Sequence, residues 1–240
     1  NQRKYETVSW NKTKKENLLG YKSGLINFEN RSELSINPYF LGLWLGDGTS
    51  ADIAITSIDE PIIKFVNEYA EVNNCKIRKE KITYHVSKKN RGTLIEINGN
   101  GIKDIATIKE ISEKYGITRS LINDVLSKKQ KQTHGFSINY VDNGKNPILE
   151  KFRDYNLINN KHIPIEYKTA SKEDRLKLLG GIIDTDGYCK DGFGYEISQK
   201  NKTLFDDIVF LCNSLGLNTR VEKPKVIKGK EYYRMTIHGA

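Results

Sequence analysis

The chain has 240 residues, of which 37% are hydrophobic and 29% charged, as in a globular protein with a core of ordinary size. It has no apolar run long enough to cross a bilayer, and its polar start, NQRKYETVSWNK, is unlike a signal peptide. A net charge of +9 favours a polyanionic partner such as nucleic acid. Three scattered cysteines, without C-x-x-C spacing, argue against a disulfide framework or zinc site and for an intracellular, reducing compartment.

The first predicted element is a helix within PYFLGLWLGDGTS, residues 38–50, which is apolar, rich in glycine and ends on one carboxylate, Asp47. Gly42 and Gly46 are four residues apart and so lie on one face of this helix. Glycine costs a helix up to about 1 kcal/mol relative to alanine, but it lets another backbone approach closely. The segment therefore predicts a helix packed tightly against a partner, with Asp47 at its end.

A short strand (DIAITS), an amphipathic helix (IDEPIIKFVNEYAEVNN) and basic β-like segments (CKIRKEKITYHVSKKNRGTLIEING) follow in order. Alternate residues of a strand share one face, so about half of the basic side chains could reach phosphates or base edges. The sequence does not say which face that is. The candidate DNA contacts of this half are Lys76, Arg78, Lys79, Lys81, His85, Lys88, Lys89 and Arg91.

An insertion over residues 104–145 reads as helix-turn-helix. Thr107 is predicted to cap a helix over 108–115, with Glu110 in the capping-box position, and Gly116 makes the turn. Thr118 then caps a second helix, which runs to about Lys128. In DNA-binding examples the second helix enters the major groove, although an ordinary helical hairpin is the alternative. The candidate contacts are Arg119, Ser120 and Asn123 on bases, and Lys128 and Lys129 on the backbone.

The last third of the chain repeats the first in kind. LLGGIIDTDGYC, residues 178–189, is a second apolar helix that ends on a carboxylate, Asp186, with Gly180 and Asp184 on one face. A strand (GYEISQ), a helix (KNKTLFDDIVFLCNSLG) and basic strands (LNTRVEKPKVIKGKEYYRMTIHG) follow. The chain is therefore an internal duplication, and the candidate DNA contacts of this half are Arg220, Lys223, Lys225, Lys228 and Arg234.

Packing of the two glycine-containing helices would bring Asp47 and Asp186 together. Like charges beside the negative ends of two helices are unfavourable unless a cation lies between them. Paired carboxylates that need Mg²⁺, on a basic surface, are typical of a phosphodiesterase. The alternative is that each Asp-Gly is only a turn after a buried helix.

FLGLWLGDG (40–48) and LGGIIDTDG (179–187) resemble the two motifs of the LAGLIDADG homing endonucleases. The likeness is to the single-chain, intein-associated DOD type, such as the endonuclease of the yeast vacuolar ATPase intein. It implies an α+β fold with two pseudo-symmetric αββαββα-like halves that form a DNA-binding saddle. We expect a junction segment (1–33), a first half (34–103), the helix-turn-helix insertion (104–145), a return segment (146–174) and a second half (175–240).

The resemblance also implies the roles of the site residues. Asp47 and Asp186 would bind Mg²⁺, or Mn²⁺ as a substitute, with the backbone carbonyls of Gly46 and Thr185. Lys161 of NKHIP and Lys230 of KGKEYYRMTIHG resemble the two supporting lysines, with Lys228 as the alternative to Lys230.

The expected activity is a double-strand break with four-nucleotide 3′ overhangs. It would be made by a monomer, not attached to a membrane, in a long asymmetric duplex target, in the nucleus or wherever the host DNA resides. A cleavage-inactive DNA-binding regulator and an RNA maturase of the same fold are the alternatives.

Overall fold

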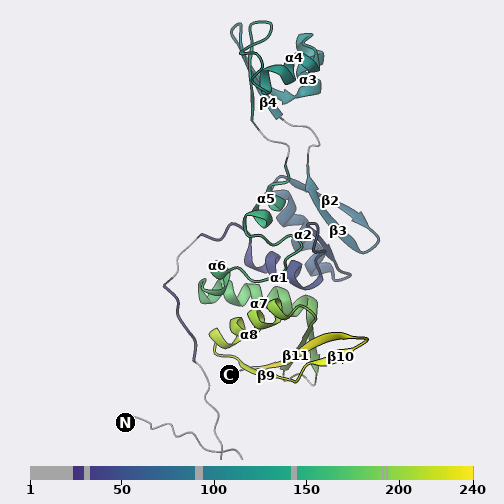
Figure 1. Cartoon of the computed structure of the whole chain (residues 1–240), viewed down its shortest axis with the longest axis vertical. Coiled ribbons are helices and arrows are strands. Elements are labelled where there is room, and N and C mark those ends of the chain that lie inside the picture. Colours follow the sequence, from purple (N-terminus) through teal and green to yellow (C-terminus); the bar gives the residue numbers. More distant parts are fainter. Residues whose placement is uncertain are drawn as a thin grey trace, which may run out of the picture.

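The computed structural model describes residues 24–29, 33–89, 94–141, 145–190, 192 and 194–239. Arg91 and most of the predicted junction segment lie outside these residues. The described part is a mixture of helices and antiparallel sheets, so the predicted α+β class is found. Figure 1 shows three bodies along the long axis, with the insertion at one end, the first half in the middle and the second half at the other end. No helix among the described residues combines the length and the apolar character of a membrane span.

The first half consists of two helices and a three-stranded antiparallel sheet, in the order β1-β3-β2. Its elements are α1 (Pro38–Asp47), β1 (Ala54–Thr56), α2 (Glu60–Val72), β2 (Cys75–Glu80) and β3 (Thr83–Lys88). Asn37 caps α1 by accepting hydrogen bonds from the backbone N–H groups of Tyr39 and Phe40. The apolar face of α2 is buried, as its periodicity predicts.

The second half also alternates a motif helix, strands, a helix and further strands, but it has an additional short helix at its start and two strands, not one, between its long helices. Its sheet runs β10-β11-β8-β7, and β9 also pairs with β11. The elements are α6 (Ile165–Lys168), α7 (Lys172–Asp186), β7 (Gly187–Lys190), β8 (Gly194–Gln199), α8 (Lys202–Ser214), β9 (Asn218–Val221), β10 (Lys225–Ile227) and β11 (Lys230–His238). Both halves contribute to one hydrophobic core, whose centre is the contact between α1 and α7.

Close packing of α1 on α7 depends on two opposed glycines. A Cβ atom on Gly42 would collide with the carbonyl oxygen of Leu178, and one on Gly181 would collide with that of Tyr39. The sequence analysis placed Gly180 and Asp184 on the contacting face of the second helix, and this is wrong for Gly180. Asp184 does reach α1, because the Tyr39 hydroxyl donates to its carboxylate at 2.6 Å. A Cβ on Gly180 would meet nothing within 4 Å, because this residue lies on the opposite side of α7 from α1.

The insertion begins earlier than predicted. It contains β4 (Leu94–Gly99), β5 (Ile102–Thr107), α3 (Ile108–Tyr115), α4 (Arg119–Leu126) and β6 (Ser137–Tyr140). Thr107 forms the predicted capping box and Thr118 caps α4, which ends two residues before Lys128. The predicted limit at residue 104 would divide β5 and separate it from β4, although the two strands pair along their full length. Residues 94–141 enclose their own core, separate from the main one.

Helix α5 (Pro147–Asp154) brings the chain back to the first half. Asn146 caps α5 through its side-chain oxygen, and its Nδ2 donates to the carbonyl of Val86 at 2.7 Å. Ile148 and Phe152 are fully buried, and the Phe152 ring packs edge-on against Trp44 at 4.8 Å. Helix α5 therefore covers the side of α1 that faces away from α7.

Residues 24–29, which precede the first half, lie against the second half. Arg175 of α7 is fully buried, and its guanidinium donates to the carbonyls of Ala170, Ser214 and Ile26. Phe28 stacks on this guanidinium at 4.9 Å. We name this arrangement the Arg175 clasp. It fastens the segment ahead of α1 to α7 and to the end of α8.

Candidate active site

Two carboxylates meet at one end of the α1–α7 contact. Both helices end at an aspartate followed by a glycine, and Gly48 and Gly187 each cap the helix in an extended conformation. A Cβ atom added to Gly46 would collide with the Thr185 side chain and come within 3.4 Å of the Asp186 carboxyl carbon. Gly46 therefore allows the two helix ends, and with them Asp47 and Asp186, to approach each other.

Both carboxylates of the pair are partly desolvated, and their pKa values are raised. Partial burial raises the pKa of Asp186 to about 6, and the negative charge of Asp47 contributes to the rise. Desolvation also raises the pKa of Asp47. Lys161 opposes both shifts and is the basic residue that influences both carboxylates.

The ammonium group of Lys161 lies at the C-terminal end of α1. Its Nζ donates to the carbonyl oxygens of Leu45 at 2.9 Å and Gly46 at 3.0 Å, and it lies 5.1 Å from the Trp44 ring centre. Burial lowers the pKa of Lys161 to about 8, although both aspartates act in the opposite direction. The predicted lysine therefore lies beside the predicted aspartates.

Helix α8 fixes the loop that carries Lys161. Asn201 caps α8 and donates its Nδ2 to the Lys161 carbonyl at 2.8 Å. Asp207 accepts a hydrogen bond from the Ile163 backbone N–H at 2.8 Å and pairs with Lys168 at 2.6 Å. Since these groups belong to the second half, they set the position of Lys161 relative to Asp186.

The structure does not bring Lys230 to the aspartates, so this prediction is corrected. Lys230 is exposed, opposite Ile227, and it follows the turn that contains Lys228. Strand β11 reaches β8 only from Tyr233 onward, opposite Gln199. A β-strand advances about 3.3 Å per residue, which leaves Lys230 and Lys228 toward the tip of the β10–β11 hairpin.

Gln199 is the residue near the pair that the sequence analysis did not select. Its Nε2 donates a short hydrogen bond to Oδ2 of Asp186, which helps keep the pKa of Asp186 from rising further. Gln199 is the last residue of β8, in the quoted segment GYEISQ. A polar side chain at the end of the strand after the second motif was the available signal.

The two predicted carbonyl ligands lie in the last turns of the motif helices. The Gly46 carbonyl accepts from Lys161, and a carbonyl oxygen has a second lone pair that remains available. The Thr185 hydroxyl bonds back to the Gly181 and Ile182 carbonyls and therefore points along its own helix.

The basic side chains on the strands divide between the two sheet faces. In the first half, Cys75, Tyr84 and Val86 face the core, while Lys76, Arg78 and His85 lie on the outer face. In the second half, Arg220 and Arg234 lie on the outer face, opposite the inward Met235 and Ile237. The basic side chains that are free to contact a partner therefore lie on the sheet face that points away from the core.

Several predicted contacts already have acidic partners. His85 lies 3.2 Å from Asp52, Arg78 lies 3.5 Å from Glu80, and Arg234 lies 3.3 Å from Glu196. Lys79, Lys81, Lys89, Lys223, Lys225 and Lys228 are exposed, whereas Lys88 is half-buried. In the insertion, Arg119, Ser120, Asn123, Lys128 and Lys129 are all exposed, and Lys129 pairs with Asp124.

The comparisons agree with the motif in the second half. Residues 173–240 match a family model described as a LAGLIDADG-like domain. This match covers α7 with Asp186 and the sheet that follows. A curated relative, the replicative DNA helicase DnaB of Mycobacterium intracellulare, is 25% identical over 194 residues. The alignment covers 81% of this chain but 21% of the helicase, so the chain spans about a fifth of that relative's length.

Among solved structures, the chain is similar to I-DmoI, which is described as a homing endonuclease. I-DmoI in complex with DNA and Ca is 15% identical, with a TM-score of 0.38, and the match covers 84% of this chain and 81% of that one. I-DmoI with DNA and Mn is 15% identical, with a TM-score of 0.39 and coverage of 84% and 88%.

Proposed function

We propose that this chain is a site-specific DNA endonuclease of the LAGLIDADG homing type, associated with an intein. It hydrolyses one phosphodiester bond in each strand and leaves four-nucleotide 3′ overhangs. The observation that carries the proposal is the cluster of Asp47, Asp186 and Lys161 where α1 meets α7. Both carboxylates have raised pKa values, and an arrangement that keeps repelling charges together at the cost of stability is typical of a functional site.

The residues of the cluster fit a hard divalent cation. A cation between Asp47 and Asp186 would offset the desolvation that raises both pKa values, and also the negative charge of Asp47 that adds to the rise at Asp186. Within the described ranges, no three His, Cys, Asp or Glu side chains gather into a metal site. The remaining ligands would then be the Gly46 and Thr185 carbonyls, water and DNA phosphate, a set that suits Mg²⁺ and also Mn²⁺. When bound, the cation supplies positive charge to the scissile phosphate and activates water.

The side chains around the aspartates have separate tasks in this proposal. Lys161, whose pKa is about 8, carries its charge at neutral pH and can donate to a phosphate oxygen that gains negative charge. Gln199 fixes the orientation of the Asp186 carboxylate by holding one of its oxygens. Lys228 and Lys230, toward the hairpin tip, are assigned to DNA phosphates.

The outer faces of the two sheets form the proposed DNA surface, with Lys76, Arg78, Arg220 and Arg234 as its central contacts. Because the two halves differ in sequence, a monomer would read a long, asymmetric duplex site. The insertion is proposed as an accessory DNA-binding element, in which Arg119, Ser120 and Asn123 at the exposed start of α4 contact base edges in the major groove. Lys128 and Lys129 hold the adjacent backbone. The protein would act wherever the host DNA resides.

A cleavage-inactive DNA-binding regulator and an RNA maturase would use the same basic surface. Neither needs two repelling carboxylates, and these favour the nuclease. DNA unwinding, the activity named for the helicase relative, is not proposed, because the chain spans about a fifth of that relative's length.

The test is cleavage of a diverse plasmid library in Mg²⁺, with sequencing of the ends, and with Ca²⁺ as a control for binding. A unique long site with four-nucleotide 3′ overhangs, lost in Asp47→Asn and Asp186→Asn, is the expected result. Tight duplex binding without cuts would indicate the regulator. Preference for structured RNA over duplex DNA in filter binding would indicate the maturase.

A further inference from the structure

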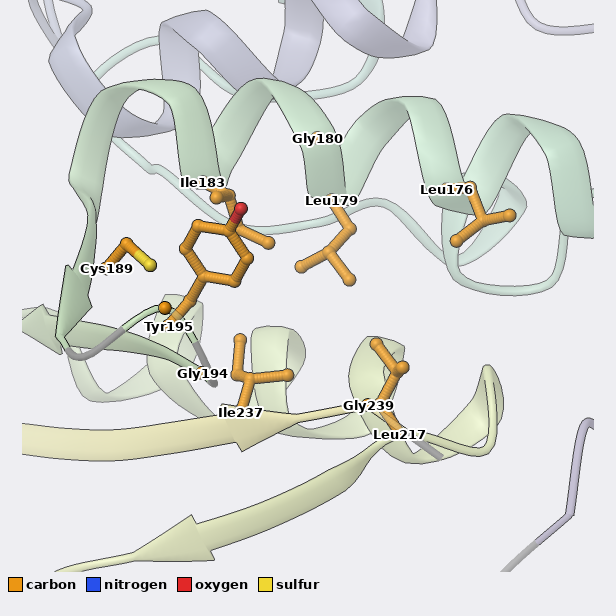
Figure 2. A pocket seen from close by; sticks show the side chains of 11 residues that line it. Leu176, Leu179, Gly180, Ile183, Cys189, Gly194, Tyr195, Leu217, Ile237 and Gly239 are labelled. Carbon is orange, nitrogen blue, oxygen red and sulfur yellow. The ribbon is translucent and has the colours of Figure 1, made fainter.

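A cavity of about 370 Å³ lies between α7 and the sheet of the second half. Its walls are mainly the side chains of Leu176, Leu179, Ile183, Tyr195, Leu217 and Ile237. Figure 2 shows the α7 side chains pointing across the cavity toward Ile237 of β11 and Leu217, which directly precedes β9. Leu176 and Tyr195 are 44% and 43% exposed, so this apolar wall is open to solvent.

The internal repeat identifies the matching place in the first half. Gly48 donates its N–H to the Trp44 carbonyl, and Gly187 donates in the same way to Ile183. Alignment on these two cap glycines matches Trp44 with Ile183. One turn earlier, it matches Phe40 with Leu179.

The sheets extend this correspondence. Strands β1 and β8 each lead into a helix of the same length, α2 and α8. Cys75 and Leu217 both follow these helices directly after a residue with positive φ, Asn74 or Gly216. Ile53 and Tyr195 occupy equivalent positions, because each lies seven residues before the first residue of the next helix. Val86 donates its backbone N–H to Ile53, and Ile237 pairs with Tyr195, so Val86 matches Ile237.

In the first half, all four matching residues contact the α5 unit. Phe152 packs on Trp44 at 4.8 Å and on Phe40 at 6.2 Å. Asn146, the cap of α5, bonds to Val86 at 2.7 Å and lies 3.5 Å from the Cys75 sulfur. Phe40 and Trp44 are therefore fully buried. The described part of the second half has no helix in the corresponding place.

We propose that this cavity is the docking site of a short amphipathic helix of the α5 kind. The occupant has about two turns, an Asn-Pro start, and bulky apolar side chains four residues apart, like Ile148 and Phe152. A small polar ligand fits poorly, because Tyr195 and Cys189 bring the only side-chain polar atoms among the lining residues, whereas ligand pockets usually contain several convergent ones. An apolar groove beside a helix is instead typical of helix-in-groove recognition.

The test uses Cys189, an exposed free thiol in the cavity wall, with the buried Cys75 and Cys212 as internal references. A copy of residues 145–156 is attached after residue 240 through a short Gly/Ser linker, because Gly239 also lines the cavity. At the roughly millimolar effective concentration of such a tether, alkylation of Cys189 should slow by about tenfold. The melting temperature of the full chain should rise with it.

The matched control is the same fusion with the copies of Ile148 and Phe152 replaced by serine, which should label like the parent chain. Leu176→Glu, at the exposed rim of the cavity, should restore fast labelling in the active fusion. Equal labelling of both fusions would overturn the proposal. So would slow labelling of the parent chain that becomes fast when residues 1–23 are removed, or protection that grows with protein concentration, because these results indicate the N-terminal segment or a second copy as the occupant.

Discussion

At the scale of single residues, the negative charge of Asp186 destabilises the folded protein. An acid whose pKa is higher in the folded than in the unfolded chain prefers its neutral form when folded. Asp186, with a pKa of about 6, therefore costs no stability below pH 4. The cost increases as the pH rises from about 4 to 6 and is complete above that range. Lys161, with a lowered pKa of about 8, has the opposite dependence, because its cost is present at neutral pH and disappears in alkali.

Asp186→Asn should therefore stabilise the protein while it abolishes cleavage. At pH 8 we expect the free energy of unfolding to rise by about 1–2 kcal/mol, after allowance for partial solvent screening. At pH 4 it should not change, as measured by urea denaturation at both pH values. Asp206→Asn, on the exposed surface of α8, is the matched control and should stay within about 0.5 kcal/mol. An equal gain at both pH values would contradict the raised pKa of Asp186.

Cation binding should depend on the same titration. A proton on Asp186 competes with the metal, so Ca²⁺ affinity should fall about tenfold between pH 7 and pH 5. Isothermal titration calorimetry of the metal-free protein measures this directly. Asp186→Asn should bind Ca²⁺ weakly at both pH values. A wild-type affinity that is independent of pH would place the ion elsewhere.

At the scale of elements, the α1–α7 contact depends on which glycine faces the partner helix. Gly42→Ala should destabilise the protein by about 2–3 kcal/mol, because the new methyl group meets the Leu178 carbonyl. Gly180→Ala, in the same pair of helices, should stabilise it by up to about 1 kcal/mol, because alanine favours the helix and has free space. Urea denaturation compares the two substitutions, and similar effects from both would contradict the observed packing.

The sequence predicted these elements well because caps and periodicity are local signals. The Thr107 capping box, the Thr118 cap and the buried face of α2 were all found where expected. The choice of Gly180 failed because two adjacent glycines differ by only about 100° around a helix, and the partner helix decides between them. Lys230 failed because its place depends on where β11 joins β8, which is a long-range register. Gln199 was missed because its approach to Asp186 depends on the pairing of β7 with β8, in which Gly187 lies opposite Ile197.

At the scale of the whole molecule, the insertion is a separate body with its own hydrophobic core. Lys88 and Lys145, on either side of the insertion in the sequence, line the same cavity beside α2 and α5. Since these two residues lie close together, replacement of residues 90–144 by a short Gly/Ser linker should leave the main core intact. Cooperative unfolding and Ca²⁺ binding should persist, while DNA affinity should fall by about tenfold or more. Calorimetry and a filter-binding titration check both statements.

A deletion that starts at residue 104, where the sequence analysis placed the start of the insertion, should behave differently. Removal of residues 104–144 alone would leave β4 without β5 and β6, and would expose Ile95 and Ile97, which are otherwise fully buried. This variant should aggregate or lose cooperativity. If the two deletions behave alike, residues 94–103 do not belong to the inserted body.

The Arg175 clasp has a consequence for the order of assembly on the ribosome. Ile26 emerges from the ribosome well before its partners Arg175 and Ser214, because 149 positions of sequence separate Ile26 from Arg175. Closure of so long a loop is slow compared with local helix formation. The segment that carries Ile26 is therefore seated late, and it cannot be fixed in place until α7 and Ser214 of α8 have been translated.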